Sequence, residues 1–113
     1  ILLEVNIGGE EAKSGFAPAQ LEDAARAAQA MSHVRVRGLM TIPPISDTEK
    51  QKRDYFCRMQ KLFIDIRDKK IDNVSMDILS MGMSSDYREA ILEGSTMVRI
   101  GTALFGKRAA VLR

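Results

Sequence analysis

The pattern of hydrophobic and polar residues divides the chain into short apolar runs and longer amphipathic segments. The apolar runs are rich in β-branched residues and end near Gly or Pro, which is typical of strands. They predict four strands, over residues 1–7, 34–42, 78–81 and 97–100. A segment with apolar residues at helical spacing follows each of the first three strands, and one short helical turn through Phe105 follows the fourth. The sequence therefore predicts the order βαβαβαβ with a short terminal helix.

The predicted helices carry signals at their ends. Pro18 suits the first turn of the first helix, and Gly94 suits the residue that follows the third. Ser46 and Glu49 have the spacing of a capping box at the start of the second and longest helix. The apolar stripe of that helix consists of Tyr55, Phe56, Met59, Leu62, Phe63 and Ile66. The last residues, 106–113, are predicted to form a terminal tail or a docking helix.

Strands that alternate with helices predict an α/β fold with a parallel sheet and right-handed crossovers. The pattern suits either half of an eight-stranded (β/α) barrel or a small open α/β sheet, and periodicity does not separate the two. We expect a single unit over residues 1–113, because no low-complexity linker divides the chain. Since residue 1 already lies in a predicted strand and is not Met, we also expect the chain to be part of a longer protein.

Composition narrows the classes of function. Apolar residues make up 45% and charged residues 28%, and 17 Lys and Arg against 15 Asp and Glu give a net charge of +2. This balance argues against a strongly basic nucleic-acid binder or a polybasic membrane anchor. No apolar run approaches the roughly 20 residues of a membrane span. The single cysteine, Cys57, predicts a reducing compartment, and hence the cytoplasm. No metal-binding or dinucleotide-binding motif occurs.

Two neighbouring strand exits carry residues that suit a phosphate group. Met83 to Asp86 follow the third strand, and Arg99 to Thr102 follow the fourth. Ligands of parallel α/β proteins lie at the carboxyl ends of strands, where helix starts offer free amides. Gly101 would let the backbone approach a phosphate closely. Ser84 and Thr102 also suit simple helix caps, but two adjacent exits of the same design favour a ligand site.

The alternation of strand residues gives Arg99 a special position. Arg99 shares the face opposite the helices with Met97 and Gly101, and Glu4 lies on the same face of the first strand. A buried arginine needs a counter-charge. Arg99 would therefore either form a structural pair with Glu4 or another carboxylate, or contact a ligand phosphate or a heterocycle nitrogen. The residues alone leave both alternatives open.

Five segments, in order along nearly the whole chain, resemble the pyridoxal-phosphate homeostasis proteins. The segments are residues 5–7, 10–15, 37–43, 79–86 and 94–106. That family is similar in fold to the N-terminal barrel of alanine racemase, a (β/α)8 barrel of the TIM type that holds pyridoxal 5′-phosphate. The resemblance implies a non-catalytic cofactor carrier or regulator of vitamin B6 pools.

The resemblance also implies roles for individual residues. Ser84 with the Met83 backbone, and Gly101 with Thr102, would bind the cofactor phosphate. Arg99 would lie at the phosphate or at the pyridine nitrogen.

Further residues would contribute less directly. Ser80 and Met40 would line the same pocket. Lys13 matches a lysine of the family's loop motif and would place a positive charge near the mouth of the pocket.

The chain corresponds to the C-terminal half of that family, and no lysine falls on a predicted strand. The lysine that forms the Schiff base with the cofactor is expected in the N-terminal half. We therefore expect a phosphate site without its covalent anchor, and either a homodimer or association with the missing half. Two alternatives are a fragment of a racemase-like fold-type III enzyme and a general α/β module for phosphate ligands. Tyr55 and Tyr87 do not match a strand-exit catalytic position, which favours the carrier over the enzyme.

Overall fold

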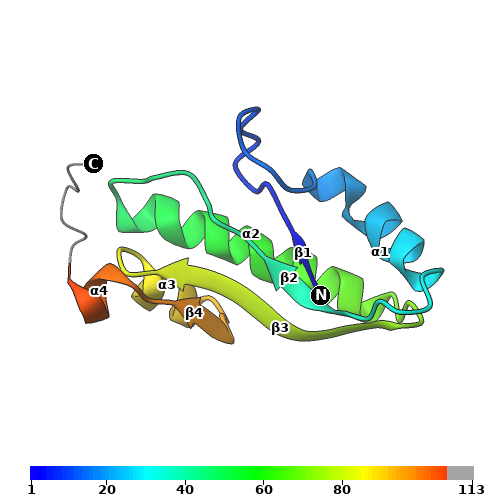
Figure 1. Cartoon of the computed structure of the whole chain (residues 1–113). Helices are drawn as coiled ribbons and strands as arrows, with labels where there is room; N and C mark the ends of the chain where they lie inside the picture. The colour runs from blue at the N-terminus through cyan, green and yellow to red at the C-terminus, as the bar shows by residue number, and fades with distance from the viewer. Residues whose placement is uncertain (107–113) are drawn as a thin grey trace, which may run out of the picture.

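Four parallel strands form one sheet in the computed structural model, which describes residues 1–106 (Figure 1). The strands lie side by side in chain order: β1 (Leu2–Glu4), β2 (Val36–Met40), β3 (Val74–Met83) and β4 (Met97–Arg99). The predicted parallel α/β fold is thus confirmed. Of the predicted terminal tail or docking helix, residues 107–113 lie outside the described part of the chain.

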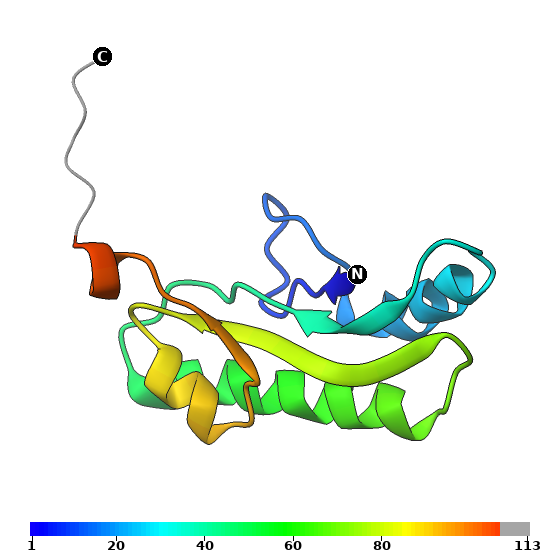
Figure 2. The same ribbon diagram turned by 60° about the horizontal axis from the view of Figure 1, so that its bottom comes forward.

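The helices follow the strands as the periodicity predicts. They are a 3-10 turn η1 (Pro18–Gln20), then α1 (Leu21–Gln29), α2 (Glu49–Asp68), α3 (Tyr87–Leu92) and α4 (Thr102–Phe105). Both α2 and α3 pack against β3, and α1 contacts β1. Figure 2 shows α2 and α3 running along the same side of the sheet. Within residues 1–106, no helix is both long enough and apolar enough to span a membrane.

The register of the sheet places the core on its helix-covered face. Leu3 pairs with Leu39, and Leu39 pairs with Leu79. All three side chains are at most 6% exposed. Phe56 and Met59 of α2 belong to the same core and are fully buried. This row of leucines against the long helix is the hydrophobic centre of the fold, since the burial of large apolar side chains is the main favourable term in folding.

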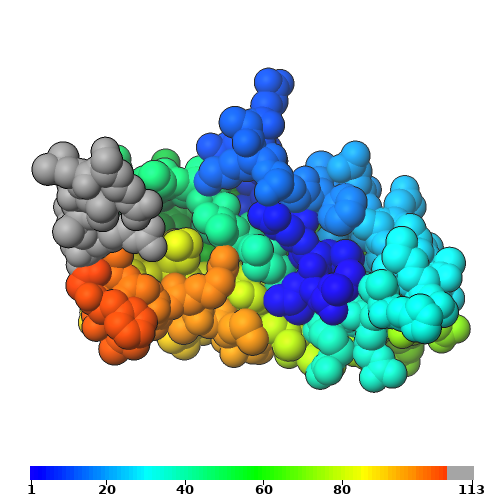
Figure 3. All heavy atoms as spheres, in the orientation of Figure 1, coloured from blue at the N-terminus to red at the C-terminus, as the bar shows by residue number. Residues whose placement is uncertain are grey.

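The opposite face of the sheet is open. On this face Met40 pairs with Ser80, and Ser80 pairs with Met97. Nearer the carboxyl ends of the strands, Met83 pairs with Arg99. Met83 and Met97 remain 42% and 45% exposed. Figure 3 shows this face, with residues of β2 and β3 visible between the N-terminal segment and β4. The predicted association of the chain through its open face and sheet edges stays a prediction.

The strand boundaries differ from those that the sequence predicts. β1 pairs only as far as Glu4, after which a single bridge joins Val5 to Phe16. The chain leaves the sheet there because the side chain of Asn6 bonds to the backbone of Glu10 and folds the following loop. β3 begins at Val74 instead of residue 78, because its first residue pairs with the start of β2.

The predicted capping box is wrong. Thr48 is the N-cap of α2, and its hydroxyl accepts a hydrogen bond from the Gln51 amide at 3.2 Å. The hydroxyl of Ser46 instead donates to the Pro44 carbonyl at 3.5 Å. Thr48 takes this place because it is the residue with extended backbone directly before the helix, as an N-cap requires.

The C-terminal end of α2 is tied to α1 by surface charges. The Lys69 ammonium lies 3.1 Å from the carboxylate of Glu22, which also accepts a hydrogen bond from Arg26 at 3.1 Å. The hydrogen bonds from Lys69 and then Arg26 hold the pKa of Glu22 below its usual range. Because all three side chains are exposed to water, this link orients the helices more than it stabilises them.

Gly38 tests the close approach of β2 and β3. A Cβ atom at this position would overlap the backbone carbonyl of Ile78, which cannot move without disrupting the sheet. We expect Gly38→Ala to lower the free energy of unfolding by about 3 kcal/mol, as overpacking does in tight interiors. Urea unfolding followed by circular dichroism measures this change.

Gly101→Ala is the matched control for stability. Within the described part of the chain, no atom other than those of its chain neighbours lies within 4 Å of a Cβ built at Gly101, and its backbone has a negative φ of −116°. Its effect on the free energy of unfolding should stay within about 0.5 kcal/mol. Equal free energies of unfolding for Gly38→Ala and Gly101→Ala would contradict the close contact between β2 and β3 at Gly38.

Candidate functional site

The carboxyl ends of β3 and β4 meet at one edge of the sheet, and a single hydroxyl joins their exits. The Ser84 Oγ accepts hydrogen bonds from the backbone amides of Gly101, at 3.2 Å, and Ala103, at 2.9 Å. Parallel strands end at the same edge, so residues 15 or more positions apart in sequence converge there. The structure thus brings together the two strand exits that the sequence singles out.

The Met83 amide is held within its own exit. It donates a hydrogen bond to the Asp86 carboxylate at 2.7 Å. Asp86 sits at the N-cap position of α3, but its side chain turns back to Met83 instead of capping the helix. The ammonium of Lys52 donates to the carbonyl of Ser85 at 3.2 Å and ties this exit to α2. Three backbone amides at the two exits therefore already point at side-chain oxygen atoms.

The space beside Gly101 is open. Apart from its chain neighbours, no atom of residues 1–106 lies within 4 Å of a Cβ built there, and Gly101 and Thr102 are both exposed. A cavity of about 330 Å³ lies beside Ser84 and is lined by residues 84–89 and Ala103. A second cavity, of about 370 Å³, lies between the exits of β2 and β3, with Met83, Lys13 and Lys52 in its wall. The site thus has room for a small ligand on both sides of the β3 exit.

Among residues 1–106 no carboxylate pairs with Arg99, so the structure does not show the first of the two alternatives, a structural pair with Glu4 or another carboxylate. The Nη2 of Arg99 donates to the backbone carbonyl of Thr41 at 2.7 Å. Glu4 lies on β1, at the far edge of the sheet, and accepts from the Ser14 hydroxyl at 3.2 Å instead. The Nε of Arg99 is buried and has no hydrogen-bond partner among residues 1–106. An unpartnered donor on a permanently charged group is costly, and it calls for an acceptor that the described residues do not supply.

Ser80 and Met40 lie on the same open face as Arg99. Met40 pairs with Ser80, and Ser80 pairs with Met97 of β4. Ser80 is only 2% exposed, because it sits between the two neighbouring strands. The structure therefore places the seven residues singled out for a ligand site on β2, β3 and β4 or directly after β3 and β4: Met40, Ser80, Met83, Ser84, Arg99, Gly101 and Thr102. Their binding roles stay predictions.

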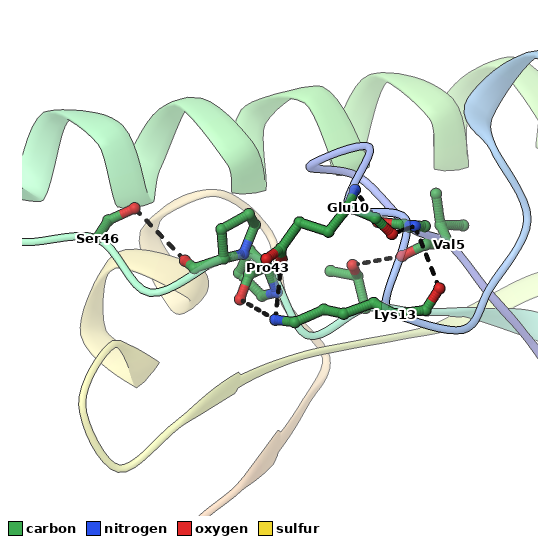
Figure 4. A network of polar contacts seen from close by, with 8 residues as sticks. Val5, Glu10, Lys13, Pro43 and Ser46 are labelled. Carbon is green, nitrogen blue, oxygen red and sulfur yellow. Dashed lines mark hydrogen bonds and ion pairs between the residues drawn. The ribbon is translucent and has the colours of Figure 1, made fainter.

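A network of polar contacts that the sequence does not predict supports the exit of β2 (Figure 4). The Lys13 ammonium lies 3.1 Å from the Glu10 carboxylate and 3.5 Å from the Pro43 carbonyl. Thr41, fully buried, donates its hydroxyl to the Val5 carbonyl at 2.7 Å. The one signal in the sequence is Thr41 itself, a hydroxyl within an apolar run that is closed by two prolines.

The comparison with known families settles the classification. Residues 1–109 match the family described as alanine racemase, N-terminal domain. The chain belongs to the alanine racemase N-terminal domain family.

The relatives of this chain include proteins of the kind that its sequence motifs resemble. A pyridoxal phosphate homeostasis protein of Aquifex aeolicus is 44% identical over 108 residues, which is 96% of this chain and 46% of the relative. The protein of the same name from Escherichia coli is 41% identical over 109 residues, again 96% of this chain and 45% of the relative. The resemblance to pyridoxal phosphate homeostasis proteins is confirmed. The chain spans about half the length of these relatives.

Solved structures agree with this assignment. PipY of Synechococcus elongatus without pyridoxal phosphate superposes with a TM-score of 0.84 at 32% identity, over 93% of this chain and 48% of that one. PipY with pyridoxal phosphate bound gives a TM-score of 0.75 at 30% identity, over 91% and 49% of the two chains. An uncharacterised protein of Bifidobacterium adolescentis gives 0.83 at 40% identity, over 92% and 42%. PipY, one of these similar structures, therefore binds pyridoxal phosphate.

The Ser84 hydroxyl provides a test of the link between the two exits. Ser84→Ala removes the acceptor of two amides, so the free energy of unfolding should fall by about 1 kcal/mol. Amide hydrogen exchange at Gly101 and Ala103 should become faster. Urea titration measures the free energy of unfolding, and NMR measures amide hydrogen exchange in the folded chain.

Ser85→Ala is the control for this test. The side chain of Ser85 is exposed, and its carbonyl, which accepts from Lys52, is unchanged by the substitution. If exchange at Gly101 accelerates equally in both variants, the hydroxyl of Ser84 does not hold the two exits together.

Proposed function

We propose that this chain supplies the phosphate-binding end of a pyridoxal 5′-phosphate site in a vitamin B6 homeostasis protein, and that it catalyses no reaction by itself. Two observations carry this proposal: the contact of Ser84 with the β4 exit, and the buried Nε of Arg99, which has no partner among residues 1–106. The names of the relatives and the cofactor bound by PipY support the choice of ligand.

The donors at the two exits fit a phosphate group. The amides of Met83, Gly101 and Ala103 are directed at oxygen atoms of Asp86 and Ser84. A phosphate presents oxygen acceptors of the same kind with more negative charge, so it can take over such donors. The open space at Gly101 lets it approach the backbone. Asp86 must then give up the Met83 amide, because its carboxylate would repel the incoming dianion.

Arg99 supplies the positive charge of the proposed site. One of the nitrogens of its guanidinium already bonds to the carbonyl of Thr41. Its Nε, which has no hydrogen-bond partner among residues 1–106, can donate to a phosphate oxygen or to the pyridine nitrogen of the cofactor. Ser80 and Met40, on the same face, would line the pocket beside it. The cofactor, when bound, contributes its aldehyde, which reacts with amines.

We further propose that the chain forms the C-terminal half of a (β/α)8 barrel. The sheet is covered by helices on one side, its open face carries exposed methionines, and the relatives are about twice as long. The remainder of such a protein would cover that face and contribute the Schiff-base lysine. Within residues 1–106 every lysine lies on a helix or in a loop, and none on a strand. A cytoplasmic location stays a prediction from the single cysteine.

Binding of the cofactor to this chain should depend on its phosphate and on Arg99. We expect pyridoxal 5′-phosphate to bind more tightly than pyridoxal in calorimetric titrations. Arg99→Ala should weaken the binding about ten- to hundredfold, since a hydrogen bond to a charged group contributes about 1.5–3 kcal/mol. Arg67→Ala, which removes an equal charge from the last turn of α2, should leave the affinity unchanged.

Two results would contradict this function. Equal affinities for pyridoxal and pyridoxal 5′-phosphate would show that the phosphate group does not contribute to binding. Competition by inorganic phosphate or ribose 5-phosphate as strong as by pyridoxal 5′-phosphate itself would instead favour a general module for phosphate ligands.

The absence of a covalent anchor from this chain is tested by reduction with borohydride. After incubation with pyridoxal 5′-phosphate, we expect no stoichiometric adduct on any one lysine, because none of the lysines of residues 1–106 lies on a strand of the sheet. Intact mass and peptide mapping measure this. An adduct of one cofactor per chain at one lysine would show that the anchor belongs to this half.

A further inference from the structure

We propose that Thr41 is a positioning residue that aims the Arg99 guanidinium at the ligand. The inference rests on the proposed function for the identity of the ligand, but it is argued from contacts within the chain. Thr41 lies directly after β2 and is fully buried, while Arg99 ends β4. The two are neighbours in space although β3 separates their strands.

Each polar group of Thr41 ties it to a different part of the sheet. Its amide donates to the Ser80 carbonyl of β3 at 3.1 Å. Its hydroxyl donates to the Val5 carbonyl at 2.7 Å, one of the contacts drawn in Figure 4. Its carbonyl accepts from the Arg99 Nη2 at 2.7 Å. Thr41, at the exit of β2, therefore contacts the exit of β1, the interior of β3 and the end of β4.

The hydroxyl is needed because the regular ladder stops at this point. The amide of Val5 donates to the Met40 carbonyl at 2.8 Å, and β2 ends at Met40, shortly before Pro43 and Pro44. The side chain of Thr41 satisfies the Val5 carbonyl in place of a ladder bond. Val5 is 1% exposed, so the loss of this donor would leave a buried carbonyl without a partner or force the exit of β2 to move.

Movement of the β2 exit would change the direction of Arg99. The carbonyl of Thr41 holds one terminal nitrogen of the guanidinium, and the guanidinium is planar. That bond therefore restricts the orientation of the guanidinium, and with it the direction of Nε, which has no partner among residues 1–106. Without it, a long arginine side chain on an open face samples many rotamers, and ordering them again on binding costs affinity.

The first measurement follows the Arg99 side chain directly. In ¹H–¹⁵N spectra, the Nε–H resonance of Arg99, assigned by its loss in Arg99→Lys, should be sharp and slow to exchange in the unmodified chain. Thr41→Val should broaden it or speed its exchange about tenfold or more, and Thr41→Ser should restore it. Thr48→Val is the control, because it removes a threonine hydroxyl bond at the start of α2, away from Arg99.

The second measurement is the affinity for pyridoxal 5′-phosphate. Thr41→Val should weaken binding about tenfold, which corresponds to the loss of about 1.4 kcal/mol. It should have no further effect in an Arg99→Ala background, because a positioning residue acts through the residue it positions. If Thr41→Val does not fold by circular dichroism, Thr41→Cys, which keeps a side chain of similar size with a weaker donor, replaces it in both measurements.

The outcomes separate this inference from the proposed function. If the unmodified chain does not bind the cofactor, the proposed function fails, while the Nε–H resonance still decides whether Thr41 orders Arg99. An unchanged resonance in Thr41→Val overturns the positioning role. An equal loss of affinity with and without Arg99 also overturns it, since Thr41 would then act through the general structure of the sheet.

Discussion

The register of the parallel sheet decides where every other feature of this molecule lies. Pairing of Leu3, Leu39 and Leu79 places three leucines in one row against α2, and their burial fixes the sheet on its helices. The same register places Met40, Ser80 and Met97 in a row on the opposite face. A slip of one residue would exchange the two rows, since strand side chains alternate. The core and the candidate site are thus specified by a single set of backbone pairings.

At the candidate site, side chains of the chain itself accept the hydrogen bonds that a bound ligand would otherwise accept. Ser84 and Asp86 supply oxygen acceptors to three amides at the two exits. Such internal partners avoid the cost of unpaired backbone groups. They would also lower the affinity of the proposed site for a phosphate, because binding would exchange existing hydrogen bonds for new ones and add only the difference in free energy. Arg99 is the exception, since its Nε has no acceptor within residues 1–106 and loses nothing when a ligand provides one.

Much of this arrangement follows from local sequence. The alternation of strands and helices predicts the parallel sheet, and the glycine and hydroxyl residues after β3 and β4 predict which exits meet. The boundaries are less predictable, because they depend on partners elsewhere. Val74 joins β3 only because Val36 lies opposite, and Thr48 caps α2 because of the path that the chain takes after two prolines. Ser46 has the right spacing for a cap, but its hydroxyl bonds to Pro44 instead.

The partner of Arg99 shows most clearly which contacts the local sequence does not predict. Charge complementarity predicts a carboxylate, since a buried cation is unfavourable without one. The sheet order instead puts Glu4 at the opposite edge and the carbonyl of Thr41 within reach. A backbone carbonyl orients a guanidinium but does not neutralise it, so the positive charge of Arg99 remains available at the end of the open face. This charge supports the proposal of an anionic ligand. In the inference drawn above, its placement depends on a threonine whose hydroxyl bonds to the backbone beyond β1.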